Sequence, residues 1–161
     1  MGLSDASSIL WRQRQLLELL LYKLEVEQSL LRGGRARWLA RATNEVGIVL
    51  DELRATELSR AIAMDEVAEL LGLIPGSTLR EIADAAPAPW ASIFAEHRVA
   101  FLALTDEIGV MADVNRDLAS DGHRAITEAL VSVQFERPDA FAGMRGSGGG
   151  RPGPVLVDEV L

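Results

Sequence analysis

The histidine and acidic side chains are the residues of this sequence that could do chemistry. His97 and His123 are its two histidines, and neither stands in a metal-binding or catalytic spacing such as His-Glu-x-x-His. His97 falls on an apolar stripe, so we expect a packed or interfacial histidine. Adjacent carboxylates on a helix point about 100° apart, which disfavours a shared proton or metal ion. We therefore expect a solvated face for three acidic pairs: Asp51-Glu52, Asp65-Glu66 and Asp106-Glu107.

Two further kinds of site are disfavoured by the sequence. The glycine-rich stretch from Gly146 to Gly153 has no predicted strand before it and no predicted helix after it, and a phosphate-binding loop needs both. The chain contains no cysteine, which excludes disulfides, thiolate metal sites and cysteine nucleophiles. We therefore expect no enzyme, no cofactor and no metal.

Composition narrows the class of protein. The net charge is −8, which argues against nucleic-acid binding, and the richest basic stretch, with Arg35, Arg37 and Arg41, is interpreted as compensated by acids. No apolar run approaches the roughly 20 residues of a membrane span. The chain opens with Asp5 and Ser7, where a signal peptide would need basic residues. The simplest interpretation is a soluble cytoplasmic protein.

Seven-residue repeats of apolar residues predict the elements. Leucine recurs at positions 10, 17, 24 and 31, Gly33-Gly34 follows, and a second repeat runs through Leu39, Val46, Leu53 and Val67. Such stripes need a partner helix to cover them. We predict a helix from Ser4 or Asp5 to Arg32, a tight turn, and an antiparallel helix over about 35–71 with weak points at Gly47 and Arg60.

Turn signals place the next elements. Gly72 can close the second helix in the left-handed conformation, and Pro75 prevents its continuation. Thr78 and Glu81 have the spacing of a capping box, which predicts a short helix that ends before Pro87.

A long helix then begins at Trp90, with a stripe at positions 90, 94, 97, 101, 104, 108, 111, 115 and 118. Asn115 is the polar residue near the end of this stripe. A structural role in setting register is preferred for it over recognition.

Beyond this helix lies an apolar face with no later helix to cover it. It either folds back onto the hairpin or is offered to a partner. The candidate partner-binding residues are Leu118, Ile126, Ala129, Leu130 and Val133. After Pro138 the pattern is lost, and a Gly- and Pro-rich linker leads to a short apolar tip, Val155 to Leu161.

The predicted fold class is therefore all-α. We expect an elongated antiparallel helical hairpin or bundle, with three long helices, a short connecting helix and a flexible C-terminal tail. Residues 1–137 would form the helical domain and 138–161 the tail, in a monomer or weak dimer.

The chain resembles the FlgN-like flagellar type III export chaperones over roughly residues 8 to 133. The resemblance rests on leucine spacing and turn placement: Leu20, Leu24 and Leu30-Leu31, then Gly34, Leu39, Ala42-Thr43 and Glu45, then Leu70-Leu71-Gly72 with residues 78–86, and finally His97 to Arg116 with Leu118. The family often has two asparagines three apart in the last stretch, whereas here Ala112 precedes Asn115.

The resemblance implies a cytoplasmic chaperone that holds hook-associated proteins unassembled and delivers them to the flagellar export machinery. It also implies that client binding maps to the C-terminal part of the chain. Two other classes stay open. A coiled-coil regulatory adaptor or self-associating structural protein would use the same repeats, and a helical-bundle enzyme would need more core polar residues than His97, Asn115 and Thr56.

Overall fold

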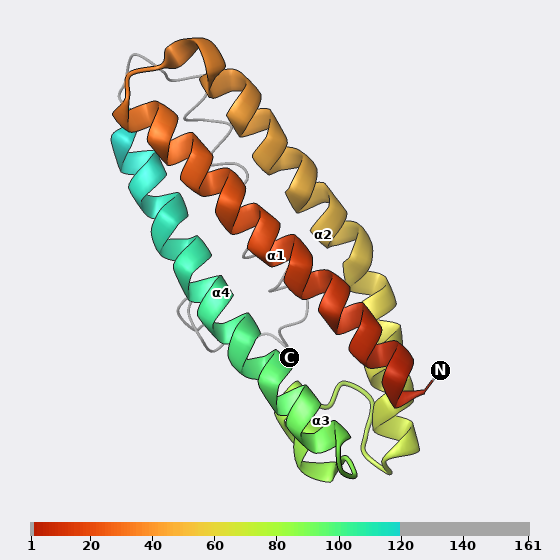
Figure 1. Cartoon of the computed structure of the whole chain (residues 1–161). Coiled ribbons are helices and arrows are strands. Elements are labelled where there is room, and N and C mark those ends of the chain that lie inside the picture. Colours follow the sequence, from red (N-terminus) through yellow and green to blue (C-terminus); the bar gives the residue numbers. More distant parts are fainter. Residues whose placement is uncertain (1, 120–161) are drawn as a thin grey trace.

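The computed structural model describes residues 2–119, which form four α-helices and no strand (Figure 1). They are α1 (Leu3–Arg32), α2 (Ala36–Leu70), α3 (Leu79–Ala85) and α4 (Trp90–Leu118). The predicted all-α class, with three long helices and a short connecting helix, is confirmed. The proposed domain boundary after residue 137 and the tail lie outside the described residues.

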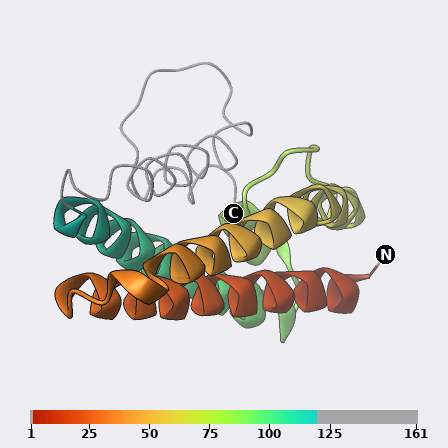
Figure 2. The ribbon, with the colours of Figure 1, turned by 90° about the horizontal axis from the view of Figure 1, so that it is seen from above.

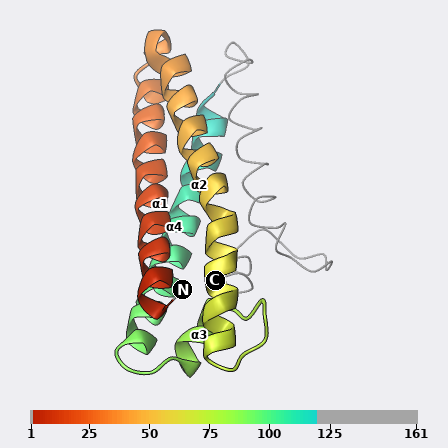
Figure 3. The ribbon, with the colours of Figure 1, turned by 90° about the vertical axis from the view of Figure 1, so that its right-hand side faces the viewer.

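Helix α1 lies between the other two long helices. It packs against both α2 and α4, whereas the backbones of α2 and α4 do not come into contact. The predicted tight turn is confirmed: α1 and α2 are antiparallel, and Gly34 adopts φ +63°, which favours glycine. Figure 2 shows α2 crossing α1 obliquely, and α4 runs parallel to α1 on its other side (Figures 1 and 3).

The seven-residue repeats form the seam between α1 and α2. Leu10, Leu17 and Leu24 are buried, Leu31 is half-buried near the turn, and all four residues of the second repeat are buried. From α4 the stripe adds Phe94, Phe101 and Ile108 to the same core. Because α1 supplies apolar side chains to two partners, its buried face is broad.

Two local predictions need correction. Helix α1 begins at Leu3, so Asp5 lies within its first turn, where its Oδ2 accepts a hydrogen bond from the Gly2 amide at 3.0 Å. Helix α2 continues without a break through Gly47 and Arg60.

Arg60 occupies the heptad position between Leu53 and Val67 and is 1% exposed. Its long aliphatic stem can pack in a seam as a leucine would. Burial lowers the pKa of the Arg60 guanidinium to about 10, with the Glu57 carboxylate opposing the shift.

The connection from α2 to α4 is held by the predicted turn chemistry. Gly72 closes α2 with φ +75°, and the Gly76 amide donates to Asp65 Oδ1 at 2.8 Å. The capping box is confirmed: the Glu81 amide donates to Thr78 Oγ1 at 3.2 Å, and the Thr78 amide donates to Glu81 Oε2 at 2.7 Å. Figure 3 shows α3 at the end of the bundle opposite the α1–α2 turn.

We expect Leu53→Asp to lower the free energy of unfolding by about 3 kcal/mol or more, because it places a carboxylate in a buried seam. Leu53 is 6% exposed, whereas Leu58 on the same helix is 71% exposed, so Leu58→Asp is the matched control. Urea unfolding followed by circular dichroism measures both variants. Equal stability of the two would show that position 53 is not in the core.

Candidate partner-binding site

Of the predicted partner-binding residues, Leu118 lies within the described part of the chain. It is the last residue of α4 and its side chain is 38% exposed. Four others, Ile126, Ala129, Leu130 and Val133, lie outside the described residues, as does His123. The described structure therefore shows what holds the starting point of this segment.

A buried polar cluster joins all three long helices close to that point. Asn115 of α4 donates through Nδ2 to the Leu24 carbonyl oxygen at 2.9 Å and to Glu27 Oε2 at 3.0 Å. Thr43 of α2 donates to Glu27 Oε1 at 2.7 Å. Asn115 and Glu27 are both 0% exposed. One carboxyl group of α1 thus accepts hydrogen bonds from both neighbouring helices, and the structural role predicted for Asn115 is confirmed.

Burial dominates the electrostatics of this cluster. Loss of water raises the pKa of the Glu27 carboxyl group, and the hydrogen bonds from Thr43 and Asn115 oppose the rise. No basic group is among the causes of the shift. The carboxyl group therefore binds its proton more tightly in the folded protein than in water.

A second buried contact anchors α4 nearer its start. His97 Nε2 lies 3.3 Å from Ser7 Oγ of α1, and its ring meets Trp11 edge-on and stacks on Phe101. Burial, followed by the charge of Arg14, lowers the pKa of His97, and Glu96 opposes this. A lowered pKa leaves the ring neutral at pH 7, so the expected packed histidine is confirmed.

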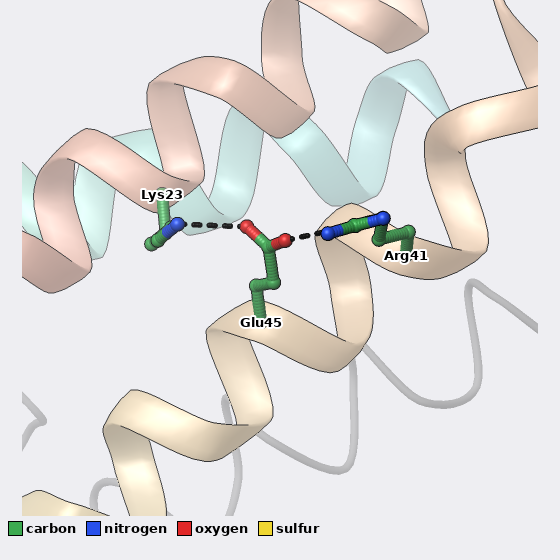
Figure 4. A network of polar contacts seen from close by, with 3 residues as sticks. All are labelled: Lys23, Arg41 and Glu45. Atoms are coloured by element: carbon green, nitrogen blue, oxygen red, sulfur yellow. Dashed lines mark hydrogen bonds and ion pairs between the residues drawn. The ribbon is translucent and has the colours of Figure 1, made fainter.

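An ion-pair network joins α1 and α2 near their turn (Figure 4). Lys23 Nζ donates to Glu45 Oε2 at 2.7 Å, and Arg41 Nε donates to Glu45 Oε1 at 3.2 Å. These hydrogen bonds, with the Lys23 bond first, hold the pKa of the Glu45 carboxyl group below its ordinary value. The network is partly exposed, so it contributes little to stability.

The acidic pairs behave largely as expected. Five of their six members are exposed, and Glu66 is partly buried. Within residues 2–119, no group of three His, Asp or Glu side chains is placed to hold a metal ion. No helix in the described part of the chain is long and apolar enough to span a membrane.

Glu27 is the important residue that the sequence analysis missed, and Thr43, named there only as part of the family resemblance, was given no role. The leucine repeat of α1 drew attention to positions 10, 17 and 24, but a parallel column at 6, 13, 20 and 27 is equally buried. That column reads Ala, Gln, Leu and Glu. The seven-residue spacing of this column could have identified Glu27 as buried, but the column mixes polar and apolar residues and so does not look like a core stripe.

The described structure is an all-α bundle whose buried polar groups hold helices together and whose last long helix ends in a partly exposed apolar residue. The chain matches the family described as FlgN protein over residues 1–144. It therefore belongs to the FlgN family of flagellar export chaperones, which is not a family of enzymes. The chain matches no curated protein and no solved structure.

Asn115→Ala should lower the free energy of unfolding by about 2–4 kcal/mol, because it removes the buried donor to Glu27 Oε2 and to the Leu24 carbonyl oxygen. Asn44→Ala, at an exposed position of α2, is the control and should be near neutral. Thermal and urea unfolding check both variants. A loss no larger at position 115 than at position 44 would contradict the role of the cluster.

Glu27→Gln tests the raised pKa. Because the folded state binds the Glu27 proton more tightly, this group makes the wild type less stable as pH rises above the ordinary value of 4.5. Glutamine carries no such proton. The stability of Glu27→Gln relative to wild type should therefore increase between pH 4.5 and pH 7.5 in urea unfolding experiments. A difference that does not change with pH, or that changes in the opposite direction, would contradict the raised pKa.

Proposed function

We propose that this protein is a cytoplasmic chaperone that binds hook-associated proteins before their export and then delivers them to the flagellar export machinery. The client-binding segment would run from Leu118 to Val133. Ile126, Leu130 and Val133 would be its anchors, with Ala129 beside them. Membership of the FlgN family supports the chaperone role, and the apolar spacing of this segment supports the location.

The observation that carries the proposal is the change in cover along the α4 stripe. Ile108 and Asn115 are 1% and 0% exposed and Met111 between them is half-buried, whereas Leu118, the next stripe position, is 38% exposed. Helix α1, which covers the stripe, ends at Arg32, close to the end of α4 (Figure 1). The same apolar spacing continues at Ile126, Leu130 and Val133.

An amphipathic helix of a client is the natural occupant of such a segment, because its apolar face must be shielded before assembly. Binding of the client must be reversible so that the client can be exported. A dissociation constant between micromolar and nanomolar, or about 8–12 kcal/mol, would be sufficient, and the exchange requires no catalysis.

A self-associating adaptor is the second candidate, and one surface favours it. Ile48, Leu58 and Ile62 on α2 are 51%, 71% and 47% exposed, and positions 48, 55 and 62 repeat every seven residues. A second copy could cover this stripe. Sedimentation of the wild type and of Ile62→Glu distinguishes the adaptor from the chaperone. The adaptor is favoured if the wild type is a dimer that Ile62→Glu dissociates and if it binds no hook-associated protein.

We expect Leu130→Asp to abolish capture of a purified hook-associated protein in a pull-down, because the new carboxylate must lose its water against an apolar client face. Leu58→Asp, on the exposed stripe of α2, should leave capture unchanged. Circular dichroism establishes that both variants are folded. Full capture by folded Leu130→Asp would place the client site elsewhere, and no capture by the wild type would contradict the proposal.

A further inference from the structure

Positive charge is concentrated at one end of this acidic protein. Residues 28–44 include Arg32, Arg35, Arg37 and Arg41 and contain no Asp or Glu, although the whole chain has a net charge of −8. The acids that were expected to compensate this basic stretch are therefore absent from it. Its first acidic neighbour on the C-terminal side is Glu45, which Arg41 shares with Lys23 (Figure 4).

The fold projects these charges from the end of the bundle. Helix α1 ends at Arg32 and α2 begins at Ala36, so the basic residues surround the tight turn (Figure 1). Arg32, Arg35 and Arg37 are exposed, and none of the three has an ion pair within the described residues. Asp113 and Asp117 lie near the end of α4, and Asp113 is paired with Arg116 at 2.9 Å. The turn therefore keeps an excess of positive charge.

A tryptophan accompanies the arginines. Trp38 is 47% exposed, and the Arg37 guanidinium carbon lies 5.0 Å from the centroid of its ring. We call Arg32, Arg35, Arg37 and Trp38 the basic tip. Indole rings favour the headgroup level of a bilayer, and guanidinium groups match phosphate oxygens through paired hydrogen bonds.

We propose that the basic tip docks end-on onto a membrane surface that contains anionic phospholipids, without insertion of a helix. A convex turn can bring several arginines to a flat array of phosphates at once. An acidic peptide would gain most from a groove, and the tip is a projecting turn.

The acidity of the rest of the chain does not prevent this docking. Electrostatic interactions in 0.15 M salt decay over about 8 Å. Helix α1 has 30 residues and is about 45 Å long, so acids at the far end are screened from a surface that the tip contacts. Docking would therefore orient the bundle with α3 away from the membrane. This inference does not depend on the proposed client.

Sedimentation of the full chain with large vesicles tests the proposal. Vesicles of phosphatidylcholine alone are compared with vesicles that contain about one third phosphatidylglycerol, and binding to the latter should fall steeply with salt. The double variant Arg35→Glu/Arg37→Glu should bind at least tenfold more weakly. Arg12→Glu/Arg80→Glu changes the net charge equally, away from the tip, and should bind as the wild type does. Circular dichroism checks that each variant is folded.

A second measurement reports on the tip itself. The chain has three tryptophans, and Trp11→Phe/Trp90→Phe leaves Trp38 as the only one. Its fluorescence should be quenched by brominated phosphatidylglycerol vesicles. The proposal is overturned by wild-type binding that is absent or equal on both vesicle types, by equal loss in the control variant, by unquenched Trp38, or by tip-dependent binding of polyglutamate or RNA without vesicle binding.

Discussion

The bundle depends on the fact that α1 alone contacts both other long helices. A helix in that position must bury two faces, and its apolar residues at positions 10, 17, 20 and 24 supply them. The hydrophobic effect alone would tolerate sliding of α2 or α4 along these faces, because leucine stripes repeat every seven residues. Register therefore needs groups that fit in one place, and the polar residues of the seam supply them.

Glu27 is the most specific of these groups. Its two carboxyl oxygens accept hydrogen bonds from Thr43 on α2 and Asn115 on α4. A one-turn shift of either helix would therefore leave a buried acceptor without its donor. Burial without a basic partner costs free energy, as the raised pKa of Glu27 reflects. The cluster therefore favours one arrangement of the helices at some cost in stability. These hydrogen bonds therefore give the end of α4 a defined position on α1.

Local sequence signals predicted the elements but not how they are assembled. Each confirmed element has a short-range sequence pattern. These patterns are the repeat at Leu39, Val46 and Leu53, the turn at Gly34 and the Thr78–Glu81 capping box. The parallel packing of α4 on α1 was not predicted, because an apolar stripe does not specify which helix covers it. The charge of Arg60 predicts a weak point in α2, but the residue is buried and its aliphatic stem can pack like an apolar side chain.

The candidate site could be predicted from sequence only in part for the same reason. An apolar spacing such as that of Ile126, Leu130 and Val133 indicates an apolar face that another surface covers. Whether that surface belongs to the bundle or to a client depends on contacts that no local sequence pattern encodes. Leu118 marks the point where the cover supplied by α1 ends. This end of the bundle also bears the exposed arginines and Trp38, while the α3 end is far from it. The described part of the molecule is thus asymmetric in charge along its length, and the proposed contact with a membrane would lie at the end of the bundle that holds the α1–α2 turn.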